Sequence, residues 1–150
     1  MDTITVVFTK TPRGILSFLV RWALPRSRFA LALSSHCYID IGDKWYEADL
    51  KAGVREVEKF ATSKGEIIVK AITYGVPDIQ AGLNFLKEQL GKKYDIKGAL
   101  GVGIGPDRDW AEDDKWFCYE LAAATLRACG RDVFNNISHI TEIALFSIKP

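Results

Sequence analysis

A cysteine in a predicted helix and a histidine on a predicted hairpin could together carry nucleophilic chemistry. Cys118 falls about one turn into a helix expected over 115–129, where Asp113 and Asp114 can cap the helix start. The positive end of a helix dipole favours the thiolate over the thiol. Because a free cysteine is mostly protonated at neutral pH, this position beside a base would create a nucleophile. The alternative is that Cys118 is a small buried residue of the core.

The histidine is His36, which lies beside two carboxylates in the predicted hairpin over 35–48. A two-residue turn at Gly42-Asp43 sets a register that places Asp49 opposite His36 and Glu47 on the diagonal. A histidine held by a carboxylate keeps one tautomer and becomes a stronger base. Either carboxylate is a candidate to orient the ring, and the register favours Asp49. The alternative is a surface histidine with solvated acidic neighbours.

Strand alternation divides the hairpin side chains between a core face and a second face that we expect to be accessible. The core face takes Cys37, Ile39 and Ile41. The second face takes His36, Tyr38, Asp40, Trp45, Glu47 and Asp49.

The remaining cysteines and histidine fit structural roles better than chemical ones. We expect Cys37 and Cys129 in the core and His139 in a surface loop. Cys118 and Cys129 would lie roughly 16 Å apart along one helix, which is beyond disulfide reach. Neither Cys-x-x-Cys nor His-x-x-x-His spacing occurs, so we predict no metal site. The glycines of 98–105 match no phosphate-binding loop, and we predict no cofactor.

These residues must be positioned by elements that the local patterns predict. Strands are expected over 4–9, 54–57, 66–74 and, at the end of the chain, 140–148. One helix is expected from Thr11-Pro12 to about Leu24, before Pro25, and another from Pro77-Asp78 to Gly91. Since helices and strands are mixed without regular alternation, we predict an α+β fold with an antiparallel sheet packed against helices.

Composition limits the classes of function. The 150 residues are 48% apolar and 26% charged, which indicates one globular domain over 1–150. A net charge of +1 argues against nucleic acid as a partner. We predict no membrane-spanning segment, because no run of ~20 apolar residues occurs. The early apolar run, residues 15–24, contains Arg21 and does not resemble a signal peptide. Three cysteines without paired spacing suit a reducing compartment. We therefore expect a cytoplasmic location.

Taken in order, three segments resemble the circularly permuted NlpC-type branch of the papain-like cysteine hydrolases, the YaeF/YiiX-like group. The segments are Ser35-His36-Cys37-Tyr38-Ile39-Asp40 with Tyr46-Glu47-Ala48, then Gly91-Lys92-Lys93-Tyr94-Asp95, then Trp116-Phe117-Cys118-Tyr119-Glu120-Leu121. In that group the histidine strand precedes the cysteine helix, as it does here. Tyr119 departs from the pattern, since the family usually has serine there.

The resemblance implies a papain-like fold and a role for each matching residue. Cys118 would be the nucleophile, and His36 the general base that later protonates the leaving group. Glu47 would orient the imidazole, with Asp49 as its competitor. The backbone N–H of Cys118 and the hydroxyl of Tyr94 are candidate donors to the oxyanion.

The expected activity is hydrolysis of an amide in a peptide-like substrate, such as a cell-wall peptide, through an acyl-thioester. Two alternatives stay open, because a fold does not fix a function. One is acyl transfer or thioester hydrolysis on lipids by the same residues. The other is a binding or structural module without activity.

Overall fold

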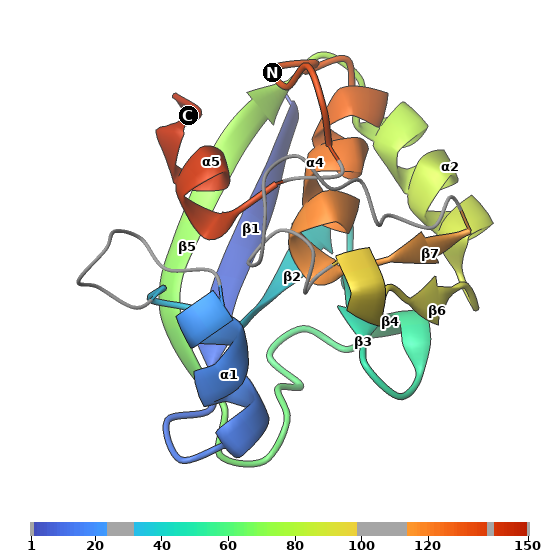
Figure 1. Cartoon of the computed structure of the whole chain (residues 1–150). Helices are drawn as coiled ribbons and strands as arrows, with labels where there is room; N and C mark the ends of the chain where they lie inside the picture. Colours follow the sequence, from blue (N-terminus) through green and yellow to red (C-terminus); the bar gives the residue numbers. More distant parts are fainter. Residues whose placement is uncertain (1, 24–31, 99–113, 138–139, 150) are drawn as a thin grey trace.

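The computed structural model describes residues 2–23, 32–98, 114–137 and 140–149 (Figure 1). Its strands are β1 (Asp2–Lys10), β2 (His36–Ile41), β3 (Lys44–Asp49), β4 (Gly53–Val57), β5 (Ile67–Val76), β6 (Lys93–Tyr94) and β7 (Lys115–Trp116). Its helices are α1 (Ile15–Ala23), α2 (Ile79–Gln89), α4 (Cys118–Ala128) and α5 (Glu142–Ser147). No helix within the described ranges has the length and apolar character needed to cross a bilayer.

Five strands form an antiparallel sheet in the order β4-β3-β2-β1-β5. The first strand therefore lies inside the sheet, between β2 and β5, and a run of β-branched and aromatic residues suits that position. A separate parallel pair joins β6 to β7. The α+β class with an antiparallel sheet is thus confirmed.

The main core lies between one face of the sheet and the helices α2, α4 and α5 (Figure 1). α4 is buried along almost its whole length, from Cys118 to Leu126. Its small residues Ala122 and Ala123 suit close packing, and both belong to the core cluster with Ile39 of β2 and Ala48 of β3. This close packing brings the N-terminal end of α4 to the strands that carry His36 and Glu47.

The hairpin has the predicted turn and alternation, but only part of its second face is accessible. Ile41 pairs with Lys44 and Ile39 with Tyr46, as expected. On the second face, Tyr38 and Trp45 form a small buried cluster with Val7. Phe60 packs on the Trp45 ring, with centroids 5.0 Å apart, while His36, Asp40 and Asp49 of the same face stay partly exposed.

β1, β4, β5 and α2 lie close to where they were expected. Two helices begin at other residues than predicted, and one predicted strand does not form. α1 begins at Ile15 rather than at Thr11-Pro12, and Leu24 and Pro25 lie outside the described residues. Residues 115–116 form a strand, so α4 begins at Cys118 rather than at 115. The segment 140–148 is not a strand.

That last segment forms the helix α5 instead. The Thr141 hydroxyl accepts a hydrogen bond from the Ala144 N–H at 3.3 Å and so caps the helix. Glu142 accepts from the backbone N–H groups of Leu33 and Ser34, at 2.8 and 2.6 Å. This long-range contact holds the segment immediately before His36 against α5, and a local apolar pattern does not reveal it.

Candidate active site

Cys118 is the first residue of α4. Phe117 occupies the N-cap position in an extended conformation, with a φ of −103°, and provides no side-chain cap. The first N–H groups of a helix have no intrahelical partners, and the helix dipole is positive there. The Cys118 side chain and its own N–H therefore lie at the electropositive end of a buried helix. Asp114 is not the N-cap residue, because Phe117 occupies that position, and Asp113 lies outside the described residues.

His36, the first residue of β2, contacts Glu47 of β3. Its Nε2 atom lies 2.6 Å from Glu47 Oε2, and Glu47 is 2% exposed. Asp49 instead accepts hydrogen bonds from the N–H groups of Lys51 and Ala52, at 2.9 and 2.7 Å. The register favoured Asp49, but that residue ends β3 and its carboxylate turns back toward the following loop. Glu47 is therefore the carboxylate that reaches the imidazole.

Arg55 of β4 holds the other oxygen of the same carboxylate. It lies directly across the ladder from Glu47, and its Nε donates to Glu47 Oε1 at 2.8 Å. The Arg55 guanidinium Nη2 is 2.7 Å from the same oxygen. Such a charge-assisted pair fixes the plane of the carboxylate. Arg55 was missed from the sequence, although the register of a β3–β4 hairpin would have revealed it.

Cys118 and His36 are 82 positions apart in the chain, and the structure brings them close enough for each side chain to shift the pKa of the other. Burial raises the pKa of the Cys118 thiol, but hydrogen bonds from Cys37 and His36 outweigh it and lower that pKa to about 5. For His36, burial lowers the pKa, and the hydrogen bonds and charges of Cys118 and Glu47 raise it to about 10. Between these values the pair is a thiolate and an imidazolium.

Cys37 is a second thiol in contact with Cys118. It is buried in the core as predicted, and hydrogen bonding from its side chain and its backbone lowers the pKa of Cys118. Burial and the neighbouring Cys118 raise the pKa of Cys37 well above its ordinary value, so Cys37 stays protonated. Two donors from one residue thus stabilise negative charge on Cys118. Strand alternation placed Cys37 on the side of the sheet that faces α4, but not beside this sulfur.

Tyr94 lies at the end of β6 and lines the same cleft as His36, Glu47 and Asp49. Its pKa is raised well above the ordinary value, first by burial and then by negative charge at Cys118. The phenol therefore remains a hydrogen-bond donor near the sulfur. The role of the Tyr94 hydroxyl as a donor to the oxyanion remains a prediction.

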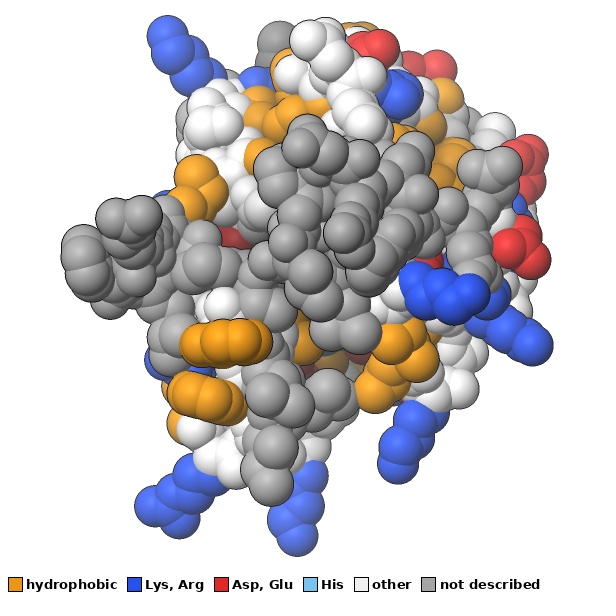
Figure 2. All heavy atoms as spheres, viewed as in Figure 1, with side chains coloured by type: hydrophobic (Ala, Val, Ile, Leu, Met, Phe, Trp, Pro, Cys, Tyr) orange, Lys and Arg blue, Asp and Glu red, His pale blue; other side chains and the backbone are white. Residues whose placement is uncertain are grey.

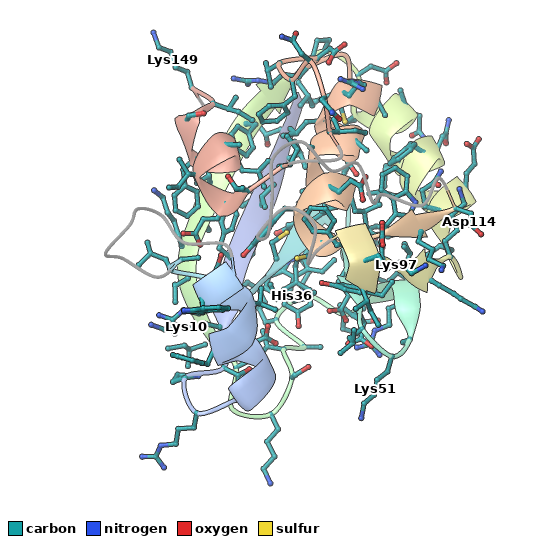
Figure 3. The ribbon with its side chains drawn as sticks, in the orientation of Figure 1. Lys10, His36, Lys51, Lys97, Asp114 and Lys149 are labelled. Atoms are coloured by element: carbon teal, nitrogen blue, oxygen red, sulfur yellow. The ribbon has the colours of Figure 1, made fainter. Side chains whose placement is uncertain are left out.

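The cleft has a volume of about 280 Å³ and lies next to His36. Figure 3 shows His36 near the N-terminal end of α4, between α1 and β3. Apolar and polar side chains line the cleft: Thr11, Ser17, Val20, Ser35, Ala48, Leu50, Ser63, Glu66 and Ile96 in addition to the four residues above. Ser17 and Val20 of α1 form one wall of the cleft. Two aromatic residues of the same helix are largely exposed: Phe18 is 51% exposed and Trp22 is 65% exposed.

Tyr119 is buried in the core. The family that the sequence resembles usually has serine at this position. The tyrosine hydroxyl shares a 2.7 Å hydrogen bond with Ser34 Oγ, and its ring packs near Phe8 and Phe117. Tyr119 thereby ties α4 to the segment that leads into His36. The tyrosine therefore supplies a contact between α4 and Ser34, and Cys118 remains the first residue of α4.

The other chemically interesting residues are separate from this cluster. Cys129 is a buried free thiol at the opposite end of α4, and Cys118 and Cys37 are free as well. His139 lies outside the described residues. Among the residues that are described, no group of three or more His, Cys, Asp or Glu side chains is arranged to hold a metal ion.

Comparisons of the chain with protein-family models, curated proteins and solved structures gave no match.

Proposed function

We propose that this protein is a cysteine-dependent amide hydrolase of the papain-like, permuted NlpC type, which acts through an acyl-thioester. The observation that carries the proposal is that His36 lies 2.6 Å from Glu47, interacts with the buried Cys118 thiol, and lines a cleft together with Glu47. A nucleophile, its base and an orienting group in contact are the elements of a catalytic triad.

The first half-reaction begins with the Cys118 thiolate. Its sulfur attacks the carbonyl carbon, a C–S bond forms, and the carbonyl oxygen becomes an oxyanion. The Cys118 N–H and the Tyr94 hydroxyl are the donors available to that oxygen. Because Glu47 is bonded to Nε2 of His36, the other ring nitrogen, Nδ1, is the atom that exchanges protons with the reacting groups. Protonated His36 gives its proton to the leaving nitrogen, the C–N bond breaks, and a thioester remains.

Water completes the second half-reaction. Neutral His36 takes a proton from a water molecule, and the hydroxide attacks the thioester carbon. Collapse of the second oxyanion breaks the C–S bond, releases the acid and returns the Cys118 thiolate beside protonated His36. Glu47 holds the ring through both steps and stabilises the imidazolium.

Acyl transfer to or from lipids is the second candidate, and the surroundings of the cleft favour it. Val20, Leu50 and Ile96 give the cleft apolar walls, and the exposed aromatic rings of Phe18 and Trp22 lie on the same helix as Val20. These side chains suit an acyl chain better than a polar peptide. In that reaction an acceptor other than water takes the acyl group from Cys118.

Reaction of the thiols with iodoacetamide across pH tests the chemistry without knowledge of the substrate. We expect alkylation of Cys118 to proceed well below pH 8, and Cys118→Ala to remove this fast reaction. Cys129→Ala is the matched control, because Cys129 is also buried but lies far from His36. Loss of turnover of an amide library in Cys118→Ala and His36→Ala, with retention in Cys129→Ala, would support hydrolysis. A Cys118 that reacts like free cysteine would support an inert module.

A labelled phospholipid separates the two reactive candidates. Acyl transfer predicts a mass increase on Cys118 that equals one acyl chain, followed by its appearance on an added acceptor. Hydrolysis of amides alone predicts no such adduct from the lipid.

A further inference from the structure

Glu142, the first residue of α5, is a buried carboxylate that the proposed mechanism does not use. Lys and Arg side chains project into solvent from the edges of the face shown in Figure 2, whereas Glu142 is 1% exposed. Its Oε1 atom accepts a hydrogen bond from the Leu33 N–H at 2.8 Å, and its Oε2 atom accepts one from the Ser34 N–H at 2.6 Å. Burial of a carboxylate is costly unless such donors surround it. Two successive N–H groups ahead of His36 are therefore bound to one carboxylate.

A chain of hydroxyl groups continues from Glu142 to α4. The Ser34 hydroxyl donates to Glu142 Oε2, and the hydroxyl oxygens of Ser34 and Tyr119 are 2.7 Å apart. Because the single Ser34 hydroxyl proton is directed to Glu142, the Tyr119 hydroxyl is the donor to Ser34. Both hydroxyl-bearing residues are buried. We call Glu142, Ser34 and Tyr119 the α5 clamp.

The α5 clamp connects the two halves of the catalytic pair. Tyr119 follows Cys118 directly on α4, and Ser34 precedes His36 by two residues. Since so little chain separates the clamp from the pair, a displacement of Ser34 relative to Tyr119 also displaces the imidazole relative to the sulfur. The clamp thus acts on the distance between His36 and Cys118 without contact with a substrate.

The backbone at His36 needs this support because His36 lies at the start of a strand. The β2–β3 ladder begins only at Ile39, three residues later. On its other side β2 is held by β1, since His36 pairs with Thr9 and the Ser35 N–H donates to the Thr9 carbonyl at 2.9 Å. The sheet therefore holds this segment from one side, and the α5 clamp adds contacts from α4 and α5.

We propose that Glu142 is a positioning residue that sets the approach of His36 to Cys118 through Ser34 and Tyr119. The inference rests on the proposed function and adds α5 to the elements on which that function depends. Catalytic groups work only when they are held to within about 0.5 Å of the productive geometry by well-packed, hydrogen-bonded neighbours. Glu142 supplies such a neighbour and takes no part in bond breaking.

Glu142→Gln tests the inference through the pH dependence of Cys118 alkylation by iodoacetamide. The variant keeps the shape of the side chain but replaces one acceptor oxygen with an NH₂ donor, which would face the donors of Leu33 or Ser34. The segment ahead of His36 must then move. We expect the alkylation limb of Cys118 to rise by about one pH unit, because the contact with His36 that lowers the pKa of the thiol is weakened.

Titration of the His36 ring by NMR is the second readout. The contact with Cys118 raises the pKa of His36, so that pKa should fall in Glu142→Gln. The chain has two histidines, and His139→Gln identifies the signals of the other ring. Neither readout needs a substrate, and a role confined to stability would move neither of them.

Two further variants separate positioning from a general loosening of α5. Tyr119→Phe removes only the hydroxyl at the far end of the clamp, and it should shift both readouts in the same direction by less. Tyr74→Phe is the matched control, since the buried Tyr74 hydroxyl donates to the Leu145 carbonyl of α5 at 2.8 Å and lies outside the clamp. We expect Tyr74→Phe to lower the melting temperature and to leave both readouts unchanged.

The outcomes distinguish this inference from the proposed function. An unmoved limb in Glu142→Gln, or in Tyr119→Phe where Glu142→Gln does not fold, would overturn the positioning role. An equal movement in Tyr74→Phe would overturn it as well, because the effect would then come from α5 in general. An unmodified protein whose Cys118 reacts like free cysteine contradicts the proposed function itself, whereas a low limb shared by every variant contradicts the positioning role alone.

Discussion

His36 and Glu47 are joined by a 2.6 Å contact between Nε2 and Oε2, and Arg55 holds the opposite oxygen of the same carboxylate. Three neighbouring strands therefore determine the orientation of one imidazole ring. The sheet is antiparallel and its ladders fix the position of each side chain along the strand, so the ring has little freedom to turn. The same ring interacts with the Cys118 thiol, which raises the pKa of His36.

The first prediction separates the two carboxylates. We expect Glu47→Gln to lower kcat/KM by about a hundredfold or more, because the amide no longer stabilises the imidazolium or selects its tautomer. Asp49→Asn is the control, and it should cost less than about tenfold, since Asp49 is bonded to its own loop. A larger loss for Asp49→Asn than for Glu47→Gln would contradict the assignment.

The second prediction concerns the pH dependence of activity. The pKa of Cys118 is lowered to about 5, so the thiolate is present above that pH and is lost as the pH falls through it. The pKa of His36 is raised to about 10, so the imidazolium is present below that pH and is lost as the pH rises through it. We expect a bell-shaped profile of kcat/KM with limbs near these values. In His36→Ala the alkylation limb of Cys118 should move to higher pH.

The third prediction assigns a supporting role to Cys37. Cys37→Ala removes the thiol donor to the Cys118 sulfur and should raise the pKa of Cys118, which slows alkylation at pH 6. Cys37→Ser retains a donor and should restore much of the rate, although serine is shorter. Because both variants keep the Cys37 backbone N–H, the effect should be smaller than that of His36→Ala. An unchanged alkylation profile in Cys37→Ala would remove this role.

The fourth prediction concerns stability where β4 approaches the segment before β6, at the close contact between Gly53 and Lys92. Gly53→Ala places a Cβ atom 2.2 Å from the Lys92 oxygen at a φ of +74°, so both a clash and backbone strain oppose it. We expect a loss of about 2–4 kcal/mol in the free energy of unfolding. Gly91→Ala is the control, with a φ of +83° but nothing within 4 Å, and strain alone should cost about 1 kcal/mol. Urea titration of both variants checks the difference, and equal losses would argue against the close approach.

Much of the scaffold could be predicted from local patterns. The turn at Gly42-Asp43 and the alternation after it predicted the β2–β3 register, and the spacing of Ile79, Leu83 and Leu86 predicted α2. The positive φ of Gly91 agrees with its predicted place at the helix end. Turn chemistry and side-chain periodicity act within a few residues, so the sequence displays them directly.

The failures have a shared cause. The segment 140–148 forms α5 where Thr141 caps it and Glu142 binds Leu33 and Ser34, and residues 115–116 form a strand because they pair with β6. The Thr141 cap is local, but the Glu142 contacts and the pairing of residues 115–116 depend on partners far away in the chain. Local propensity gives no account of such partners.

The same distinction holds for the candidate site. The sequence by itself supplied the residue types and their order, with Cys118 at a helix start and His36 on a hairpin between core and polar faces. Only the tertiary structure decided that Glu47 rather than Asp49 meets the imidazole, and that Cys37 and Arg55 join the cluster. The choice depends on how α4 packs on β2 and β3 and on where β3 ends, since a shift of one residue turns a side chain to the other face.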